Sequence, residues 1–312
     1  MKVLLTGASS FTGAWFATTL RAGGHDVVAT LRGAAASYTE GRGRRVQLLR
    51  DGGIPLVEHC SFGDSRFMAL LREGFDIICH HGAQVGNYKS LDFDVLGAVR
   101  ENAQNVSQVL QLASQEGVRG LVLTGSVFEQ DEGLGPEPRR AFSPYGLSKG
   151  LTWEVFRYWG DQLKWPVHKF VIGNPFGPYE EPRFCAYLMK QWSKGEAAMV
   201  STPNYIRDNI HVSLLAASYV AFIEQAVRSQ KGLHCGPSGY IESQGQFSRR
   251  FASEVGRRLG LRAELTFAEQ REFSEPELRV NVDRPALNSL GWSEAEAWDA
   301  LAIYYRSIYL VE

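Results

Sequence analysis

Two residues four positions apart, Tyr145 and Lys149 in SPYGLSKG (143–150), have side chains suited to proton transfer. On a helix they lie on one face, about one turn apart. A tyrosine has a reference pKa of about 10 and exchanges protons poorly at neutral pH, but a nearby ammonium group favours the phenolate and lowers that pKa. The pair is therefore a candidate general acid or base, in which Lys149 tunes Tyr145.

Hydroxyl groups follow a predicted strand shortly before this pair. The run LVLTGSVFE (121–129) places Thr124 and Ser126 at the end of an apolar stretch. Ligands of open parallel sheets bind beyond the carboxyl ends of the strands. We therefore expect these hydroxyl groups at the same edge as the Tyr145 helix, where they are potential hydrogen-bond donors to a substrate oxygen.

A glycine-containing turn, TGASSFTG (6–13), follows the apolar run KVLLT (2–6) at the start of the chain. Gly7 permits a tight turn, Gly13 lets the next helix pack closely, and helix N-terminal amides attract a pyrophosphate. Where a second glycine is usual the sequence has Ser10, whose small side chain offers a hydroxyl group to a phosphate oxygen. The turn predicts a dinucleotide site.

The second predicted strand, DVVATL (26–31), is followed by Arg32 and carries no acid at its end. NAD enzymes usually have Asp or Glu there, which accepts hydrogen bonds from the ribose hydroxyls. An arginine pairs instead with the 2′-phosphate of NADP and stacks on adenine. This pattern favours NADP(H) as the cofactor, with NAD(H) as the alternative, in which Arg32 is only a solvated surface residue.

The elements that must position these groups alternate regularly in the first half of the chain. Helical patterns, notably 92–117 and 145–163, separate six apolar runs of strand length: 2–6, 26–31, 54–58, 76–80, 119–125 and 167–173. Sustained alternation predicts right-handed βαβ units and an α/β fold with a doubly wound parallel sheet of the Rossmann type.

The pattern changes after residue 174, where it becomes less regular and richer in proline. We expect a dinucleotide-binding Rossmann domain at 1–173 and a smaller, mainly substrate-binding domain at 174–312. Later helices, at about 205–229, are expected to pack back on the first domain. A closing helix is expected from about 294, because SEAE (293–296) has the form of a capping box.

Taken together, TGASSFTG, the strand-end hydroxyl and YGLSK resemble the extended short-chain dehydrogenase/reductase family that works on nucleotide sugars. The likeness covers nearly the whole chain. Further matches to the family's segments are Asn102 in RENAQNV, GNPFGPY (173–179) as its NxxGP segment, RDNIHV (207–212) as its RDFIHV stretch, and LGW (290–292).

The resemblance implies roles for particular residues. The catalytic set is Thr124, Tyr145 and Lys149, with Ser126 as the reserve candidate for Thr124. Cofactor contacts are implied for Gly7, Ser9, Ser10, Phe11, Thr12, Gly13, Arg32, Cys60, Ser61, Gly82, Ala83, Lys149 and Pro175, the last beside the nicotinamide. Substrate contacts are implied for Gln84, Ser126, Asn174 and Arg207, the last at the substrate diphosphate.

Two positions depart from the family pattern. Cys60 stands where the family commonly has an Asp that contacts adenine. Gly125 and Ser126 follow Thr124, where sugar-nucleotide 4,6-dehydratases have an Asp–Glu pair that performs the elimination. Neither residue can act as that acid–base pair, so dehydratase activity is not expected.

Composition excludes several classes of protein. The formal net charge of −1 gives no overall field that would recruit nucleic acid or an anionic membrane. No apolar run approaches the roughly 20 residues of a membrane span. Four scattered cysteines lack disulfide or metal-site spacing: Cys60, Cys79, Cys185 and Cys235. We therefore expect a soluble cytoplasmic protein.

The adjacent histidines and the two apolar helical stretches indicate neither a metal site nor a further catalytic site. His80 and His81 are adjacent at a strand end, so they point to opposite faces and are poor joint metal ligands; no metal is expected. The helices at 92–117 and 145–163 are more apolar than one buried face requires. Such helices pair as a four-helix bundle in the family, which implies a homodimer; a fully buried monomeric helix is the alternative.

The leading hypothesis is an NADPH-dependent reductase of a 4-keto-6-deoxy sugar carried on a nucleoside diphosphate. Hydride would pass from nicotinamide to the keto carbon while Tyr145 gives a proton to the oxygen, Thr124 polarises that oxygen, and Lys149 tunes Tyr145 and anchors the ribose. The alternatives are a nucleotide-sugar epimerase with tightly bound NAD and a non-catalytic NADP-binding protein of the same fold.

Overall fold

The computed structural model of the chain describes residues 1–86 and 90–310. The chain folds into two compact units, each made of separate segments. Unit 1 comprises Met1–Glu132, Pro138–Ile172 and Ala216–Gly236, and unit 2 comprises Gly133–Glu137, Gly173–Leu215 and Pro237–Glu312. None of the described helices is long and apolar enough to cross a membrane.

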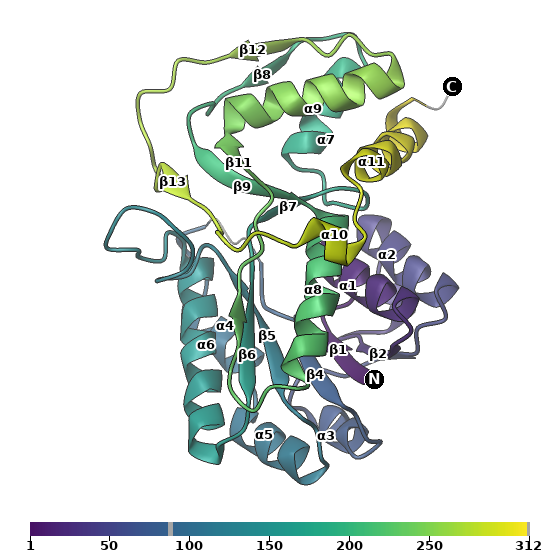
Figure 1. Ribbon diagram of the computed structural model, residues 1–312, viewed down its shortest axis with the longest axis vertical. Helices are drawn as coiled ribbons and strands as arrows, with labels where there is room; N and C mark the ends of the chain where they lie inside the picture. Colours follow the sequence, from purple (N-terminus) through teal and green to yellow (C-terminus); the bar gives the residue numbers. More distant parts are fainter. Residues whose placement is uncertain (87–89, 311–312) are drawn as a thin grey trace. The chain divides into compact units, whose positions relative to one another are not determined.

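Unit 1 is built on a parallel sheet with the strand order β10-β6-β5-β4-β1-β2-β3 (Figure 1). The order reverses between β1 and β4, and doubly wound sheets bind ligands at such a point. This arrangement confirms the predicted Rossmann-type fold. The strands are β1 (Lys2–Thr6), β2 (Asp26–Thr30), β3 (Leu56–Val57), β4 (Ile77–His80), β5 (Leu121–Ser126), β6 (Val167–Ile172) and β10 (His234–Cys235).

Helices cover this sheet and bury its apolar strands. On one face, α5 and α6 pack against β5, with Val109 and Phe156 of the helices and Leu121 of the strand in the same core. The helical elements of unit 1 are α1 (Phe11–Ala22), the 3₁₀ turn η1 (Ala35–Ser37), α2 (Glu40–Asp51), α3 (Ser65–Leu71), α4 (Val95–Asn102), α5 (Val106–Gln115), α6 (Pro144–Leu163) and the second half of α8 (Val212–Ala226).

The helix expected at 92–117 is in fact two helices, α4 and α5. Asn105 lies between them with a φ of 51°, a left-handed conformation that ends a helix and that Asn tolerates better than most residues. Its side-chain Nδ2 donates to the Gly63 carbonyl at 2.9 Å. A Cβ on Gly63 would lie 1.9 Å from the Gln104 carbonyl oxygen, so the break is fixed by a close backbone contact.

Unit 2 has two small sheets. In the larger one β9 (Ile206–His211) pairs with β7 (Asn174–Phe176), β11 (Tyr240–Ser243) and β13 (Leu278–Arg279). The other elements are β8 (Ala198–Val200) paired with β12 (Leu265–Phe267), and the helices α7 (Phe184–Trp192), α9 (Gln244–Leu259), α10 (Leu287–Leu290) and α11 (Glu294–Tyr309).

The helices α9 and α11 of unit 2 begin where the sequence supplies capping groups. Ser243 and Gln246 form a full capping box at the start of α9. The Ser293 hydroxyl accepts from the Glu296 amide at the start of α11, as the SEAE pattern predicts. An aromatic core that includes Phe176, Phe251 and Trp298 then joins β7, α9 and α11.

Candidate active site

The turn after β1 and the turn after β4 touch each other at the carboxyl edge of the sheet. Gly7 has a φ of +77°, and a Cβ there would lie 2.6 Å from the Gly82 amide nitrogen. A Cβ on Gly13 would lie 2.2 Å from the Gly7 carbonyl oxygen, so α1 begins directly against the turn. Both glycines of the motif are therefore required by space, and the turn leads into a helix N-terminus.

Ser10 is the N-cap residue of α1. Its Oγ accepts from the Gly13 amide at 3.1 Å and lies 3.0 Å from His81 Nε2. The Thr12 hydroxyl lies at the same distance from that nitrogen. Protein groups thus contact the Ser10 hydroxyl, which is partly buried, and its expected contact with a phosphate oxygen stays a prediction.

A buried hydrogen-bond chain holds the turn after β4 in place. The Gly82 amide donates to Thr6 Oγ1 at 2.9 Å, Thr6 Oγ1 lies 2.8 Å from His80 Nδ1, and His80 Nε2 lies 2.8 Å from the Asn102 carbonyl oxygen. Because a carbonyl only accepts, Nε2 of His80 carries the proton and Thr6 donates to Nδ1. The Gln84 amide donates to Asn102 Oδ1 at 2.8 Å, which ties Gln84 to α4.

The two adjacent histidines face opposite sides of the sheet. The His80 ring stacks on Phe62, with centroids 4.1 Å apart, whereas the His81 ring packs edge-on against Phe16 at 5.1 Å. Burial lowers the pKa of each to about 3, so both imidazoles are neutral at physiological pH. Among the described residues no three His, Cys, Asp or Glu side chains form a group that could hold a metal ion.

Arg32 follows β2 and reaches across the sheet edge to the turn after β4. Its guanidinium donates to the Ala83 carbonyl at 2.7 Å and to Gln84 Oε1 at 3.3 Å, and lies 3.9 Å from a Glu101 carboxylate oxygen. The side chain is half exposed. Arg32, Ala83 and Gln84 are therefore neighbours beside the glycine turn.

Cys60 and Ser61 lie beyond the end of β3, near the end of β2. The Cys60 amide donates to the Leu31 carbonyl at 2.9 Å, and the Ser61 amide donates to Asp64 Oδ2 at 2.7 Å. Burial raises the pKa of the Cys60 thiol to about 12, so the thiol is neutral and supplies only weak hydrogen bonds.

Sequence reasoning missed one arginine of this region. Arg45 of α2 is 1 % exposed, and its Nε donates to the Ser9 carbonyl at 2.9 Å, which brings a buried cation to the glycine turn. The residue belongs to the arginine-rich stretch GRGRR (41–45), and nothing in that stretch indicates which arginine turns inward.

The catalytic candidates lie near the end of β5 and the start of α6. Lys149 is buried, and its Nζ donates to the Thr124 carbonyl at 2.5 Å. Burial lowers the pKa of Lys149 to about 8, opposed by Glu129, which raises it, and reinforced by Lys169. Tyr145 lies one turn earlier on α6 and meets the Phe93 ring edge-on, with centroids 6.3 Å apart.

The Thr124 hydroxyl is buried and lies near the Tyr219 hydroxyl of α8, although no hydrogen bond of acceptable geometry joins it to a described residue. Ser126, the reserve candidate, accepts from the Phe128 amide at 3.2 Å through its own hydroxyl. An unpartnered buried hydroxyl group is costly unless a ligand satisfies it. The roles of Thr124 and of Ser126 toward a substrate oxygen stay predictions.

A buried ionic cluster lies directly behind the β5 turn and was not predicted from sequence. Glu129 Oε1 accepts from the Ser126 amide at 2.6 Å while its Oε2 lies 2.7 Å from Lys169 Nζ. Glu132 lies 2.5 Å from the same nitrogen, and His234 lies 2.9 Å from Glu132. The cluster fixes the backbone that follows Thr124.

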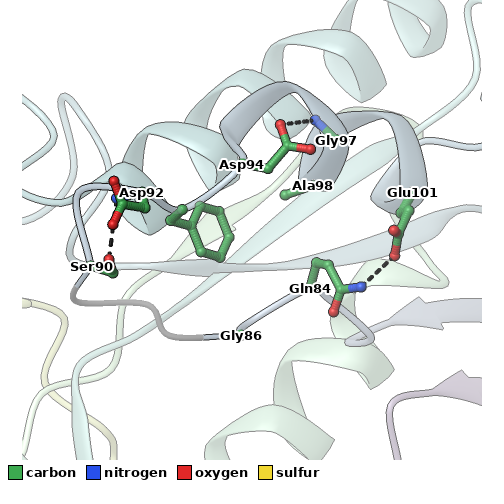
Figure 2. Close-up of a pocket in the computed structure, with 9 residues that line it drawn as sticks. Gln84, Gly86, Ser90, Asp92, Asp94, Gly97, Ala98 and Glu101 are labelled. Atoms are coloured by element: carbon green, nitrogen blue, oxygen red, sulfur yellow. Dashed lines mark hydrogen bonds between the residues drawn. The ribbon is translucent and has the colours of Figure 1, made fainter.

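A pocket of about 360 Å³ opens beside α4 (Figure 2). Gln84 lies in its wall and donates through Nε2 to Glu101 at 2.6 Å, and Asp94 accepts from the Gly97 amide at 2.9 Å. Phe93, which meets Tyr145, also lines it. The lining residues are Gln84, Gly86, Ser90, Asp92, Phe93, Asp94, Gly97, Ala98 and Glu101.

Unit 2 holds the remaining predicted residues. Asn174 and Pro175 of β7 are the register partners of Asn209 and Ile210 on β9. Arg207, two residues before Asn209, is 7 % exposed; burial lowers its pKa. Nη1 donates to three backbone carbonyls and Nη2 lies 3.1 Å from Glu275.

Three further residues of this sheet were missed by sequence reasoning. Arg279 of β13 is buried and is the register partner of Arg207. Asn209 Nδ2 and His211 Nε2 are buried and have no hydrogen-bond partner within the described part of the chain. The Ser213 amide donates to His211 Nδ1 at 3.2 Å, so Nε2 carries the proton. β9 thus presents two unsatisfied donors on the face that carries Arg207.

Comparison with known proteins assigns the family. No curated protein sequence matches the chain. Among solved structures, a UDP-glucuronic acid 4-epimerase variant from Bacillus cereus, with NAD and a UDP-sugar analogue, is similar with a TM-score of 0.76, 18% identity and coverage of 99% of this chain and 100% of that one.

Two further structures show the same fold. UDP-glucose 4-epimerase of Thermus thermophilus with NAD gives a TM-score of 0.67, 21% identity and coverage of 98% and 99%. DesIV, a dTDP-glucose 4,6-dehydratase of Streptomyces venezuelae with NAD, gives a TM-score of 0.70 and 20% identity. The match covers 98% of this chain and 97% of that one. The model of the NAD dependent epimerase/dehydratase family matches residues 3–235, well over half of the sequence. The chain therefore belongs to the NAD dependent epimerase/dehydratase family.

Proposed function

We propose that this protein is an NADPH-dependent reductase of a 4-keto-6-deoxy sugar carried on a nucleoside diphosphate. The observation that carries the proposal is Arg32 at the end of β2, where an NAD enzyme usually has an acid. Its half-exposed guanidinium can exchange its contacts with Ala83 and Gln84 for a 2′-phosphate, a bidentate partner that an arginine suits.

The residues around the glycine turn fit a dinucleotide. Gly7 and Gly13 leave no room for side chains, which lets a pyrophosphate approach the backbone, and the α1 amides supply donors with partial positive charge. Arg45 adds a cation behind Ser9. Bound NADPH would supply the hydride for reduction of a carbonyl group.

The proton for this reduction would come from Tyr145. As the hydride adds to the keto carbon, the Tyr145 hydroxyl transfers its proton to the carbonyl oxygen, and the Lys149 ammonium stabilises the phenolate that remains. The Thr124 hydroxyl, which has no hydrogen bond of acceptable geometry to a described residue, would donate a hydrogen bond to the same oxygen and polarise the carbonyl. Solvent then returns the proton to Tyr145.

On the substrate side, unit 2 supports recognition of a nucleoside diphosphate. Arg207 and Arg279 bring two buried cations side by side, and the Asn174 and Asn209 side chains lie on neighbouring strands in register with each other. We expect the diphosphate to take the place of Glu275 at Arg207. The free Nδ2 of Asn209 would donate to a further oxygen of the substrate.

The proposal is tested by adding NADPH and dTDP-, GDP- or CDP-4-keto-6-deoxyhexoses to the purified protein and following the nicotinamide absorbance. We expect oxidation of NADPH with at least one of them. Tyr145→Phe should lower kcat by about 10²- to 10⁴-fold and leave NADPH binding intact. Tyr158→Phe on the same helix serves as the control, and no loss of absorbance with any substrate would refute the proposal.

A nucleotide-sugar epimerase is the second candidate, favoured by the family assignment and by neighbours that are epimerases with NAD bound. Epimerases that recycle hydride internally usually retain NAD. Identification of the nucleotide that co-purifies with the chain separates the two functions, since tightly held NAD would indicate an epimerase. A non-catalytic NADP-binding role would require that Tyr145→Phe leave cellular function unharmed.

A further inference from the structure

The hydroxyl groups of Ser10 and Thr12 and the imidazole of His81 form one cluster beneath the glycine turn. Both oxygens lie 3.0 Å from His81 Nε2, although the histidine is 71 and 69 residues away in the sequence. The other ring nitrogen, Nδ1, is buried and has no hydrogen-bond partner in the described part of the chain. The contact at Nε2 is thus the polar contact that fixes this ring.

Ser10 occupies a position where a side chain is a steric problem. A dinucleotide turn brings its backbone close to a pyrophosphate, which is why glycine is usual in its middle. The Ser10 hydroxyl faces inward, because it accepts from the Gly13 amide and meets His81. Since Oγ already accepts from Gly13, its hydrogen is available to the imidazole. The serine is therefore folded back into the helix cap.

We propose that His81 is a positioning residue for the cofactor turn: it holds Ser10 in the inward rotamer, so that the turn binds a pyrophosphate through backbone amides as a glycine turn does. Ser10 then acts as a helix cap and not as a phosphate ligand, in place of the contact expected from the sequence. The inference rests on the proposed function only in requiring that a nicotinamide dinucleotide occupies this turn.

The same contacts predict what happens when the histidine is removed. An apolar residue at position 81 would remove the imidazole from both hydroxyl groups. The buried Thr12 hydroxyl would lose its contact with the ring, and the partly buried Ser10 hydroxyl would keep only the Gly13 amide, which costs free energy. Rotation of the Ser10 hydroxyl outward relieves that cost, but it abandons the Gly13 cap and places an oxygen atom in the path of the phosphate. Glycine at position 10 removes this conflict, because there is no hydroxyl group to rotate.

A double-mutant cycle on cofactor affinity tests the proposal. Dissociation constants for NADPH would be measured by calorimetry for the parent chain, Ser10→Gly, His81→Leu and the double variant. We expect the dissociation constant of Ser10→Gly for NADPH to lie within about twofold of the parental value, because replacing an N-cap serine by glycine costs a helix little stability. His81→Leu should bind about tenfold more weakly, and the double variant should recover most of that loss.

Two outcomes would overturn the proposal. If His81→Leu weakens NADPH binding by the same factor whether position 10 holds Ser or Gly, the histidine acts only by packing against Phe16. A loss of more than fivefold from Ser10→Gly alone would show that the hydroxyl binds phosphate. If His81→Leu fails to fold, His81→Gln, whose amide can reach both hydroxyls, replaces it and should retain parental affinity.

The experiment also separates this inference from the proposed function. If the parent chain bound neither NADPH nor NAD, the cofactor assignment would fail before the cycle began. If it bound NAD in preference to NADPH, the assignment of Arg32 would fail, and the cycle on Ser10 and His81 would be run with NAD and judged by the same criteria.

Discussion

The role proposed for Lys149 requires that its side chain stay protonated although it is buried. Burial lowers its pKa to about 8, so the ammonium is present below that pH and is lost as the pH rises through it. Loss of the charge removes the group that stabilises the Tyr145 phenolate. We expect kcat/KM for the reduction to fall above a pH of about 8, and a rate unchanged up to a pH of about 10 would contradict this role.

Asn209 offers a test that needs no catalysis. A buried amide nitrogen without a partner destabilises the ligand-free protein, and a substrate oxygen would satisfy it. Asn209→Leu should therefore raise the Tm of the free chain while reducing the further rise caused by a nucleoside diphosphate sugar. Asn288→Leu on α10, an exposed position, is the control. A lower Tm for Asn209→Leu would show that its side chain only supports the fold.

The turn after β5 lies between a buried ion cluster and Lys149, the proposed catalytic lysine. Glu129 and Glu132 both contact Lys169, but only Glu129 also holds the Ser126 amide and raises the pKa of Lys149. Glu129→Gln should therefore move the upper limb of the pH–rate profile to lower pH. Glu132→Gln is the matched control, which should lower the Tm through Lys169 and leave the profile in place.

An unchanged pH–rate profile in Glu129→Gln would show that the buried ion cluster around Lys169 only stabilises the fold. Both variants are expected to lose stability, because each leaves the buried Lys169 with one carboxylate fewer. The position of the pH profile, and not the Tm, therefore decides between the two roles.

The elements that the sequence predicts best are those with long, continuous patterns. The strands β1, β2, β5 and β6 and the helix α6 lie within about two residues of their predicted bounds, because apolar runs of that length fit a buried strand or a long helix. The two-residue strand β3 also lies within the run predicted at 54–58, whereas β10 and the short strands of unit 2 are too brief to show a period. The helix break at Asn105 depends on Gly63, which is distant in sequence.

Some residues of the candidate site could likewise be predicted from a local sequence pattern, and others could not. Tyr145, Lys149 and the glycine turn could be predicted because their spacing along the chain reflects one helix turn or one tight loop. His81 and Arg45 could not be predicted as parts of the glycine turn, since their contacts with Ser10 and Ser9 span 71 and 36 residues. Contacts of that range follow from the strand order of the sheet and not from any local pattern.

The helices α4 and α6 carry exposed apolar side chains that predict a homodimer. Leu96 of α4 is 72 % exposed and Leu147 of α6 is 41 % exposed, and the two helices are neighbours in unit 1. Burying such residues against a second copy would remove apolar surface from water.

We expect the parent chain to sediment as a dimer and the Leu96→Asp/Leu147→Asp variant to sediment as a monomer. Ile303→Asp on α11, a residue that is 70 % exposed, should leave the dimer intact and serves as the control. A monomeric parent chain would contradict the prediction.

The proposed function is net reduction of a sugar nucleotide at the expense of NADPH. This function is tested by supplying NADPH deuterated at the transferable position of the nicotinamide together with a nucleoside-diphosphate 4-keto-6-deoxyhexose. The mass of the sugar product is then measured by mass spectrometry. We expect one deuterium atom in each product molecule and one NADP⁺ formed with it. A sugar nucleotide epimerised without deuterium, with the NADPH unconsumed, would contradict it.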